Sequence, residues 1–564
     1  MSGAYTWSDL RGADLFWILD LDIQGQLYRF STKALSFSDD SGLMHRYVPG
    51  LEDLEVEDRA ALPGESLGDL EASITILFAT DSGGGWGSLV SSSFSFLGQS
   101  LGELSLIREG DSWDNRQVIL SGSVSSASWG AYGEPVQLSL SASPWQGEGT
   151  RTQLPGSTAV CNSSTWPRSS SSGVKLGEGM DGQIYPYIWG SPGFRGPRGQ
   201  SGYHGWPALI VEIDDTDLSN LNNPAIVLVA GHPSPSVGTS NRVRLWNVDG
   251  TGTIKSTGIL LTPQLVTDDL GRPVTIVSVP HSSGTIADGH ELWCTFETET
   301  EGGIPSDVTT AQAMRAAPEI IAYLLQAGSV AADTGQIRSL YLPGFLLDGW
   351  VNEVSDPLDI VLDDILPLLP VSMRIGPRGL QLLRIPLTAT PSLAIAHIDP
   401  EIYGGSRASA VQLTDPANVA NKFTLEFAYK ASGDSRYLGR RVYAPSRLAD
   451  DGEADVSPYL QASESVYGLK EAAPQASDWI MSPATAQSVL DWKTRWESTV
   501  KATVSYLLPQ EYQSLKPMDL VTLTDSDLSW ASVPAIVLSV LRAPGPTVLE
   551  LLVFPDFIRD SPTN

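Results

Sequence analysis

Apolar and polar residues alternate at every second position over much of this sequence. The alternation is clearest near the two ends of the chain, in WILDLDIQGQLYRFS (17–31) and ASITILFA (72–79) and again in VKATVSYLL (500–508) and DLVTLTD (519–525). A period of two is typical of β-strands that bury one face. The sequence therefore predicts a mainly β fold in which each end of the chain forms a β-barrel or sandwich, with a hairpin turning at Gln24–Gly25 in the first of them.

The period changes to 3.6 between residues 306 and 405, which predicts a smaller α+β region. The segment APEIIAYLLQAG has Pro318 in its first turn and stops at Gly328, as helices commonly do. The segment SDPLDIVLDDILPLLP offers Asp356 as N-cap and Pro357 as the first helical residue. The apolar stripe of this second helix comprises Leu358, Val361, Leu362 and Ile365.

Each terminal unit is predicted to hold a single helix. Near the C-terminus, Ser482 caps a helix that Pro483 opens, and one face of it carries Val489, Trp492 and Trp496. Near the N-terminus, the segment WGSLVSSSFSFLG (86–98) has near-helical spacing of Leu89, Phe94 and Leu97. The two ends are thus expected to be of related build, although no residue-level repeat is visible.

A chain of 564 residues is too long for a single hydrophobic core. The segment CNSSTWPRSSSSG (161–173) is typical of a flexible linker. Beyond it, strands are predicted in PALIVEID, PAIVLVAGH, RVRLWNVDGTGTI and RPVTIVSV, with VDGT as a tight turn. We therefore divide the chain into an N-terminal β-barrel domain (1–147), a linker (148–177), an inserted β-rich domain (178–305), an α+β domain (306–405) and a C-terminal β-barrel domain with one helix (406–564).

The chain carries 65 acidic residues against 35 basic residues, which gives a net charge of −30. Such a surface repels nucleic-acid phosphates and anionic membranes, so sequence-specific binding of nucleic acid is not expected. The charge does suit a passage through which DNA slides without sticking. The start of the chain, MSGAYTWSDLRGADLFWILDLD, is unlike a signal peptide, and no later apolar run approaches a membrane span. We expect a cytoplasmic product without stable membrane insertion.

Two segments match the GxSxG pattern of hydrolase nucleophiles, GESLG (64–68) and GQSLG (98–102). A nucleophile elbow needs a strand before the serine and a helix after it. Ser66 precedes a predicted strand, and Ser100 lies where a predicted helix passes into a strand. We therefore interpret both serines as turn or helix-end residues.

The metal-ligand patterns are equally weak. HELWC (290–294) begins like a zinc protease helix, but Cys294 occupies the second ligand position and the segment lies among predicted strands. DDTDLSNLNN (214–223) lacks the glycine and glutamate of a calcium loop. Cys161 and Cys294 are the only cysteines and are expected to be free, partly buried thiols. We expect no metal site and no cofactor.

Other catalytic chemistry also lacks a motif. SGGGWG (82–87) is interpreted as a flexible turn rather than a phosphate loop. Asp363 and Asp364 are adjacent and point apart on a helix, so their spacing does not indicate a glycosidase pair, although a cleft that joins distant acids is left open. The 16 tryptophans are scattered singly and are interpreted as core and interface anchors rather than sugar platforms. No residue is assigned a catalytic role, and the chain is not expected to be an enzyme.

Glycine stands at every third position of GSPGFRGPRGQSGYHGWP (190–207). A collagen triple helix has this period, but six triplets are few, and Phe194, Tyr203 and Trp206 stand where proline would stiffen the strand. We predict a glycine-hinged surface loop whose basic residues, Arg195 and Arg198, form a candidate contact.

Several segments together resemble the baseplate hub proteins of long-tailed bacteriophages. Near the C-terminus these are LTDPANVANKFTLEFAY, SVYGLKE, SPATAQSVLDWKTRWES and YLLPQEYQSLKPMDLVTLTD, followed by a closing strand pair. Further upstream they are IYPYIWGSPG (184–193), DDLGRPVTIV (268–277) and the helix pair ending LLPLLPVSMRIGPRGLQLL. The resemblance covers most of the chain but carries no catalytic residues.

The resemblance implies a structural protein at the tail tip of a virion that is assembled in the host cytoplasm. A homotrimer of such chains would form a six-fold to three-fold adaptor ring around the DNA exit channel. Its partners would be the tail tube or distal tail protein, the tape measure protein, and a central fibre or spike. The region 148–305 would be an insertion into a minimal hub.

Two other classes of function are left open. A receptor- or carbohydrate-binding protein of the tail tip would fit the many tryptophans and the β-rich middle region. A cell-wall hydrolase would need a catalytic constellation that no motif in the sequence indicates.

Overall fold

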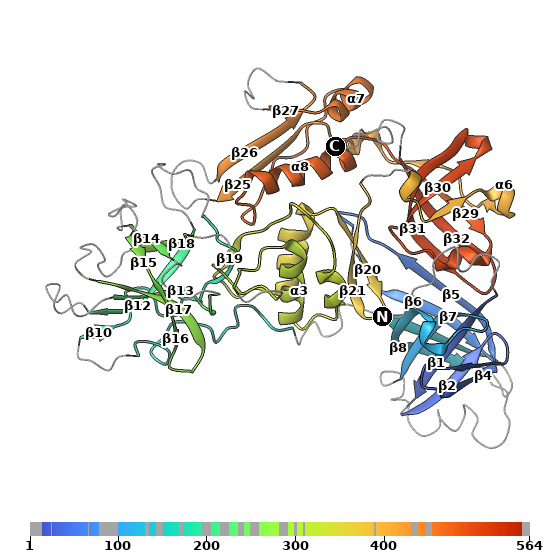
Figure 1. Cartoon of the computed structure of the whole chain (residues 1–564), viewed down its shortest axis with the longest axis horizontal. Helices are drawn as coiled ribbons and strands as arrows, with labels where there is room; N and C mark the ends of the chain where they lie inside the picture. The colour runs from blue at the N-terminus through green and yellow to red at the C-terminus, as the bar shows by residue number, and fades with distance from the viewer. Residues whose placement is uncertain are drawn as a thin grey trace.

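The computed structural model is mainly β and is divided among several hydrophobic cores, as the alternation and the chain length predict. In Figure 1 the inserted β strands lie at one end of the molecule, helix α3 (Ala317–Ala327) lies near the middle, and the N-terminal and C-terminal strands lie together at the other end. The structure describes residues 14–23, 25–65, 67–77, 100–129, 135–142, 151–168, 173–193, 205–214, 225–234, 242–248, 259–280, 291–297, 302–307, 311–387, 391–429, 437–446 and 454–554.

The N-terminal β unit has its own core, in which Trp17, Leu19 and Leu21 alternate along the first strand and are fully buried. Its strands are hydrogen-bonded in the order β5-β6-β9-β8-β7-β1-β2-β4-β3. They are β1 (Leu15–Ile23), β2 (Gln26–Ser31), β3 (Leu35–Ser38), β4 (Met44–Pro49), β5 (Leu51–Arg59), β6 (Leu70–Ile76), β7 (Leu101–Arg108), β8 (Gln117–Trp129) and β9 (Val136–Ala142).

The predicted first hairpin is confirmed. Ile23 pairs with Gln26, and Gly25 in the turn between them has φ +84°, a conformation that glycine adopts without steric cost. The predicted strand over 72–79 is present as β6. The helix predicted over 86–98 lies outside the described residues.

The inserted β domain is an eight-stranded sheet of order β15-β14-β18-β12-β13-β17-β16, with β10 paired to β12. Only Thr262 separates β15 from β16, yet these strands lie at opposite ends of that order, so the sheet folds back on itself around a buried core. The strands are β10 (Val174–Lys175), β12 (Trp206–Asp214), β13 (Ala225–Ala230), β14 (Val243–Val248), β15 (Ile259–Leu261), β16 (Pro263–Thr267), β17 (Pro273–Val279) and β18 (Glu291–Phe296).

The prediction of a flexible linker is wrong for residues 161–168. Cys161 and Trp166 are fully buried in a core that they share with Tyr185 and the inserted β domain. The Trp166 Nε1–H donates to the Tyr185 hydroxyl over 2.9 Å. The polar composition of the segment misled the prediction, because these two side chains are enough to anchor it.

The chain passes to strands β12–β18 of the inserted β domain and returns from them at one place. Strand β11 (Tyr187–Trp189), which follows β10 and precedes β12, pairs with β19 (Gly349–Val351) of the α+β region. After the domain, the Ile304 N–H donates to the Ile188 carbonyl over 2.8 Å. The two connections therefore run side by side.

The described glycines of the periodic segment do not have collagen geometry. Gly190, Gly193 and Gly205 have φ of +64°, +77° and +99°, whereas a triple helix needs φ near about −75°. Gly190 is also packed tightly, because a Cβ there would lie 2.1 Å from the Asp348 Oδ1. Residues 194–204, with Arg195 and Arg198, lie outside the described residues, so the predicted contact loop remains a prediction.

The central unit contains the predicted α+β elements. Helix α3 has Pro318 in its first turn and Gly328 as its C-cap, and the Asp356 carboxylate accepts from the Leu358 N–H over 2.9 Å, as predicted. The second helix is not continuous, since it changes from α to π and then to a 3-10 turn. The remaining elements are α4 (Thr334–Arg338), α5 (Pro357–Asp359), the π-helical turn η5 (Ile360–Ile365), the 3-10 turn η6 (Leu366–Leu368), β20 (Val371–Gly376) and β21 (Gly379–Arg384).

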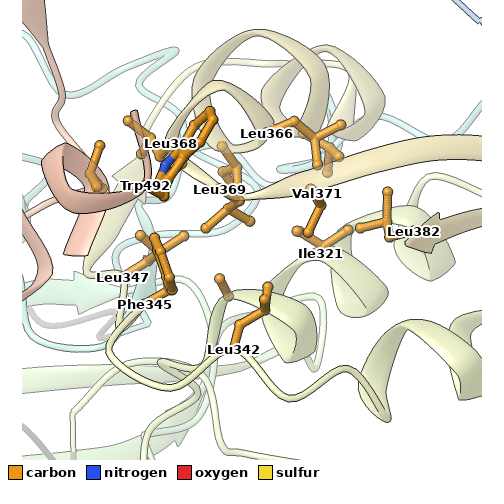
Figure 2. Packing of buried hydrophobic residues seen from close by; sticks show 14 of the residues in the cluster. Ile321, Leu342, Phe345, Leu347, Leu366, Leu368, Leu369, Val371, Leu382 and Trp492 are labelled. Atoms are coloured by element: carbon orange, nitrogen blue, oxygen red, sulfur yellow. The ribbon is translucent and has the colours of Figure 1, made fainter. Parts of the chain in front are cut away.

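The C-terminal region is divided between two cores, which the sequence did not predict. Its described residues contain two α-helices, α7 (Pro458–Tyr467) and α8 (Pro483–Glu497), and α8 packs against the central unit rather than within a C-terminal barrel. Val489, Trp492 and Trp496 are buried there, and the Trp492 Nε1–H donates to the Leu368 carbonyl over 2.8 Å (Figure 2). A small sheet also belongs to this region. It is formed by β25 (Phe423–Tyr429), β26 (Tyr437–Ala444), β27 (Ala454–Val456) and β28 (Gln475–Ala476).

The other strands of this region form the C-terminal β unit, with its own core around Tyr506, Val521 and Leu551. The strands predicted here from residues 500 to 554 are all present. They are β29 (Ala502–Leu508), β30 (Leu520–Asp525), β31 (Trp530–Arg542) and β32 (Thr547–Val553), with the short strands β22 (Ala396–Ile398), β23 (Ser406–Arg407) and β24 (Gln412–Leu413) and the short helix α6 (Pro400–Tyr403) beside them.

Strand β31 joins the two terminal β units into one 16-stranded sheet. Its first half pairs with β30, and its last residues pair with β5 of the N-terminal β unit, from Ser539 opposite Arg59 to Arg542 opposite Val56. The predicted terminal units are therefore continuous through backbone hydrogen bonds (Figure 1).

We expect Gly190→Ala to destabilise the chain by more than the cost of placing a non-glycine residue in the left-handed conformation. Adopting the left-handed conformation costs a non-glycine residue about 1–2 kcal/mol, and the new Cβ would in addition displace the buried Asp348 carboxylate. Gly179→Ala is the matched control, because Gly179 has φ +76° and a methyl group added there would have no atom within 4 Å. Urea unfolding of both variants measures the difference, and equal losses of stability would contradict this account.

Candidate functional site

The structure does not support Ser100 as a nucleophile. The residue is fully buried and immediately precedes strand β7, whereas a nucleophile elbow places the serine in the open before a helix. Ser66 lies outside the described residues.

The two cysteines are buried free thiols, as predicted. Burial raises the pKa of Cys161 to about 12 and raises the pKa of Cys294 well above its ordinary value, so neither supplies a thiolate at neutral pH. Cys294 lies within strand β18 rather than on a helix, while His290 lies outside the described residues. Within the described ranges, no group of histidine, cysteine and acidic side chains could hold a metal ion.

Two other candidate loops fall almost wholly outside the described residues. Asp214 ends strand β12, but residues 215–223 of the calcium-like segment are not described, nor is the glycine-rich segment 82–87. In the described part of the chain, no helix is long and apolar enough to cross a membrane.

The tryptophans described with their side chains are anchors rather than exposed platforms. Those that are buried are Trp17, Trp166, Trp189, Trp206, Trp246, Trp479, Trp492 and Trp496. The half-buried ones are Trp113, Trp293, Trp350 and Trp530. A flat, exposed indole face for stacking on sugar is therefore not found among them.

One cavity brings distant acids together, which is the arrangement that the sequence left open. It has a volume of about 440 Å³, and its lining includes Asp363 and Asp364 from η5 and Asp478 from the segment before α8. Burial raises the pKa of Asp364; a hydrogen bond with Trp479 opposes this effect, and the charges of Asp363 and Asp478 add to it. The Asp478 Oδ1 accepts a hydrogen bond from the Tyr437 hydroxyl over 2.7 Å. This acidic cavity is the place to look for the hydrolase alternative.

A buried ion-pair cluster lies where the N-terminal β unit, the central unit and the C-terminal β unit meet. The Asp58 Oδ2 on β5 lies 3.2 Å from the Arg374 Nη1 on β20 and 3.0 Å from the Arg542 Nη1 on β31. Arg542 is fully buried and also donates to the carbonyls of Gln513 and Leu515. One carboxylate thus pairs with two guanidinium groups and connects three parts of the molecule. We call Asp58, Arg374 and Arg542 the junction triad.

A second pair of charges adjoins the junction triad. The Asp519 carboxylate accepts from the Lys516 N–H over 2.7 Å. Burial raises the pKa of Asp519 to about 6, against the opposing effects of Lys516, Arg374 and Arg542. Burial, together with the nearby Arg374, also lowers the pKa of Lys516. The ionised form of Asp519 therefore lowers the stability of the folded protein.

Sequence reasoning missed the junction triad, although one signal was available. Leu54, Val56 and Asp58 occupy the buried positions of the alternating strand LEDLEVEDR. An acid at a position where the alternation requires an apolar residue indicates a buried partner of opposite charge. The identity of that partner depends on contacts between residues hundreds of positions apart.

Comparison with known proteins adds no family assignment. No protein-family model and no curated protein matches the sequence. Among solved structures, alignments were found with the 43 kDa tail protein of prophage MuSo2 from Shewanella oneidensis (8% identity, TM-score 0.35, covering 96% of this chain and 100% of the other) and a tail protein from Neisseria meningitidis MC58 (10%, 0.32, 96% and 97%). A third is a chain in the virion of a native gene transfer agent particle (13%, 0.17, 50% and 80%). With TM-scores below 0.5, these alignments carry no argument about this chain.

We expect Asp58→Asn to destabilise the junction by about 3–5 kcal/mol, because it removes the carboxylate that pairs directly with both buried guanidinium groups. Glu57→Gln is the control on the adjacent, exposed position of the same strand and is expected to change stability by less than about 0.5 kcal/mol. Urea unfolding, followed by the fluorescence of the buried tryptophans, compares the two. A similar small loss in both would show that the triad contributes little.

Asp519 is expected to make stability depend on pH between about 4 and 6. The folded state holds this proton more tightly than the unfolded chain, so stability falls as pH rises through that window and is constant above it. At pH 7 the ionised carboxylate costs about 3 kcal/mol, and Asp519→Asn should recover part of this cost and flatten the profile. Unfolding midpoints measured from pH 4 to 8 provide the test. An unchanged slope in the variant would contradict the assignment.

Proposed function

We propose that this protein is a structural hub at the tip of a long bacteriophage tail. Copies of the chain form a homotrimer whose two terminal β units per subunit build a six-fold to three-fold adaptor ring around the DNA exit channel. The ring contacts the tail tube or distal tail protein and the tape measure protein above it and a central fibre or spike below it. It acts through its interfaces and has no catalytic role.

The observation that carries the proposal is the joining of the two terminal β units by strand β31. Most of the segments that resemble hub proteins fall in the central and C-terminal parts of the chain, and DDLGRPVTIV (268–277) falls in the inserted β domain. An adaptor ring needs two similar units per chain at a fixed mutual angle, and a shared sheet with a buried ion-pair cluster provides this rigidity. The net charge of −30 suits a channel that DNA crosses without binding.

Exposed apolar side chains on both terminal β units supply surface for contacts between subunits. On the N-terminal β unit, Leu27 and Leu101 flank Asp22 in register on neighbouring strands and are 50% and 61% exposed. On the C-terminal β unit, Ile402 and Leu413 are 72% and 69% exposed.

The hydrolase alternative is favoured by one observation, the acidic cavity around Asp364 and Asp478. It is separated from the hub proposal by zymography on host peptidoglycan with the native chain and with Asp364→Asn. Lysis by the native chain that the variant loses would favour the alternative. Lysis by neither leaves the hub as the function that the residues support.

We expect the purified chain to have three times the subunit mass by size-exclusion chromatography with light scattering. Leu101→Asp should dissociate the trimer, because it places a charge in an apolar contact between subunits. Leu265→Asp on the inserted β domain is the control, since Leu265 is 50% exposed but lies away from the terminal β units. Antibody labelling in electron microscopy should then place the chain at the tail tip of virions.

Two outcomes would overturn the proposal. One is a strict monomer over the whole accessible range of concentration. The other is labelling along the tail or on the capsid instead of at the tip.

A further inference from the structure

A second cavity is an apolar groove beside the central core. It has a volume of about 710 Å³ and is lined by Leu62 from the loop after β5, by Leu362 and Leu366 from the central helix, and by Met373 and Trp492. In Figure 2, Leu366 lies near Val371, and Trp492 lies beside Leu368. A groove lined in this way offers anchoring positions for apolar side chains.

The rim of the groove is acidic. Glu65, Asp363 and Glu497 line it, and Lys493 is the single cation among the described lining residues. The Lys493 Nζ lies 3.4 Å from the Glu497 Oε1, so its charge is already balanced. The groove therefore favours an occupant that carries a positive charge next to apolar side chains.

The described chain ends close to this rim. Phe554 is buried, and its ring lies edge-on to Trp496 with 6.1 Å between the ring centroids. Trp496 is adjacent to Glu497 and lies one helical turn beyond Trp492 on α8. The sequence after Phe554 reads PDFIRDSPTN, in which two apolar residues are followed by a cation, Phe557–Ile558–Arg559. Three extended residues span about 10 Å, and they start from Phe554, which contacts Trp496 next to Glu497 of the rim.

We propose that the segment after Phe554 binds in this groove of its own chain. Phe557 and Ile558 occupy the apolar lining, and Arg559 lies at the acidic rim formed by Glu65 and Asp363. The segment thereby fastens the end of the C-terminal β unit to the central unit and to the loop after β5. The inference depends on the groove and on the sequence of the segment, and it is independent of the proposed role as a hub.

Disulfide trapping in the full chain tests this directly. Asp560→Cys is combined with Asp363→Cys, and a mild oxidant such as copper phenanthroline is added. The native thiols do not interfere, because both are buried and their pKa values are raised. We expect a disulfide within one chain, forming at least about tenfold faster than in a control pair, because docking gives the two thiols a high effective concentration.

The control pair is Asp560→Cys with Asp364→Cys. Asp364 is the neighbour of Asp363 and is also an exposed acid. It lines the acidic cavity but does not line the apolar groove. Adding Phe557→Ser to the Asp363 pair should lower the rate to that of the control, since the apolar anchor is lost.

Each remaining outcome overturns the proposal. Equal rates in the two pairs would mean that the segment does not occupy the groove. Species of double or triple mass on a denaturing, non-reducing gel would mean that the segment of a second copy occupies it. A rate that Phe557→Ser leaves unchanged would mean that proximity alone, without binding, brings the thiols together.

Discussion

The shared hydrogen bonding of Asp58 with Arg374 and Arg542 is the interaction on which the arrangement of the parts depends. Arg374 comes from the central unit and Arg542 from the C-terminal β unit. Asp58 comes from the N-terminal β unit. Removing the carboxylate would leave two buried guanidinium groups without their direct partner, which costs more than the loss of an exposed contact. The β5–β31 pairing fixes the direction in which the strands meet, and the ion pairs select that register over a slipped one.

Local features of the fold were predictable because they depend on neighbours in sequence. The period of two located the strands of both terminal units, and the proline and cap signals located α3 and α8. Residues 161–168 were misjudged because two buried side chains, Cys161 and Trp166, outweigh a polar composition. The assignment of α8 to the central core was not predictable, since it depends on where Trp492 finds a partner for its indole N–H.

The candidate sites likewise include features that depend on neighbours in sequence and features that depend on distant contacts. The strand that the sequence predicts after Ser100 is present as β7. The acidic cavity could not be foreseen, since Asp364 and Asp478 are more than a hundred residues apart and meet only through the packing of the small sheet on the central unit. The single signal for the junction was an acid on the apolar face of β5. An acid at such a position indicates a buried partner of opposite charge, but the sequence does not say which residue that partner is.

The side-by-side connections at Ile188 and Ile304 have a consequence for how this architecture can change. Because the backbone leaves and returns at adjacent hydrogen-bonded positions, strands β12 to β18 are connected to the rest of the chain by two neighbouring segments. These strands also pack on other parts of the molecule, since Trp293 on β18 contacts Trp350 on β19, and the core around Cys161 and Trp166 includes residues of β12 and β17. A different set of strands could therefore take their place through the same two connections only if it also covered these side chains.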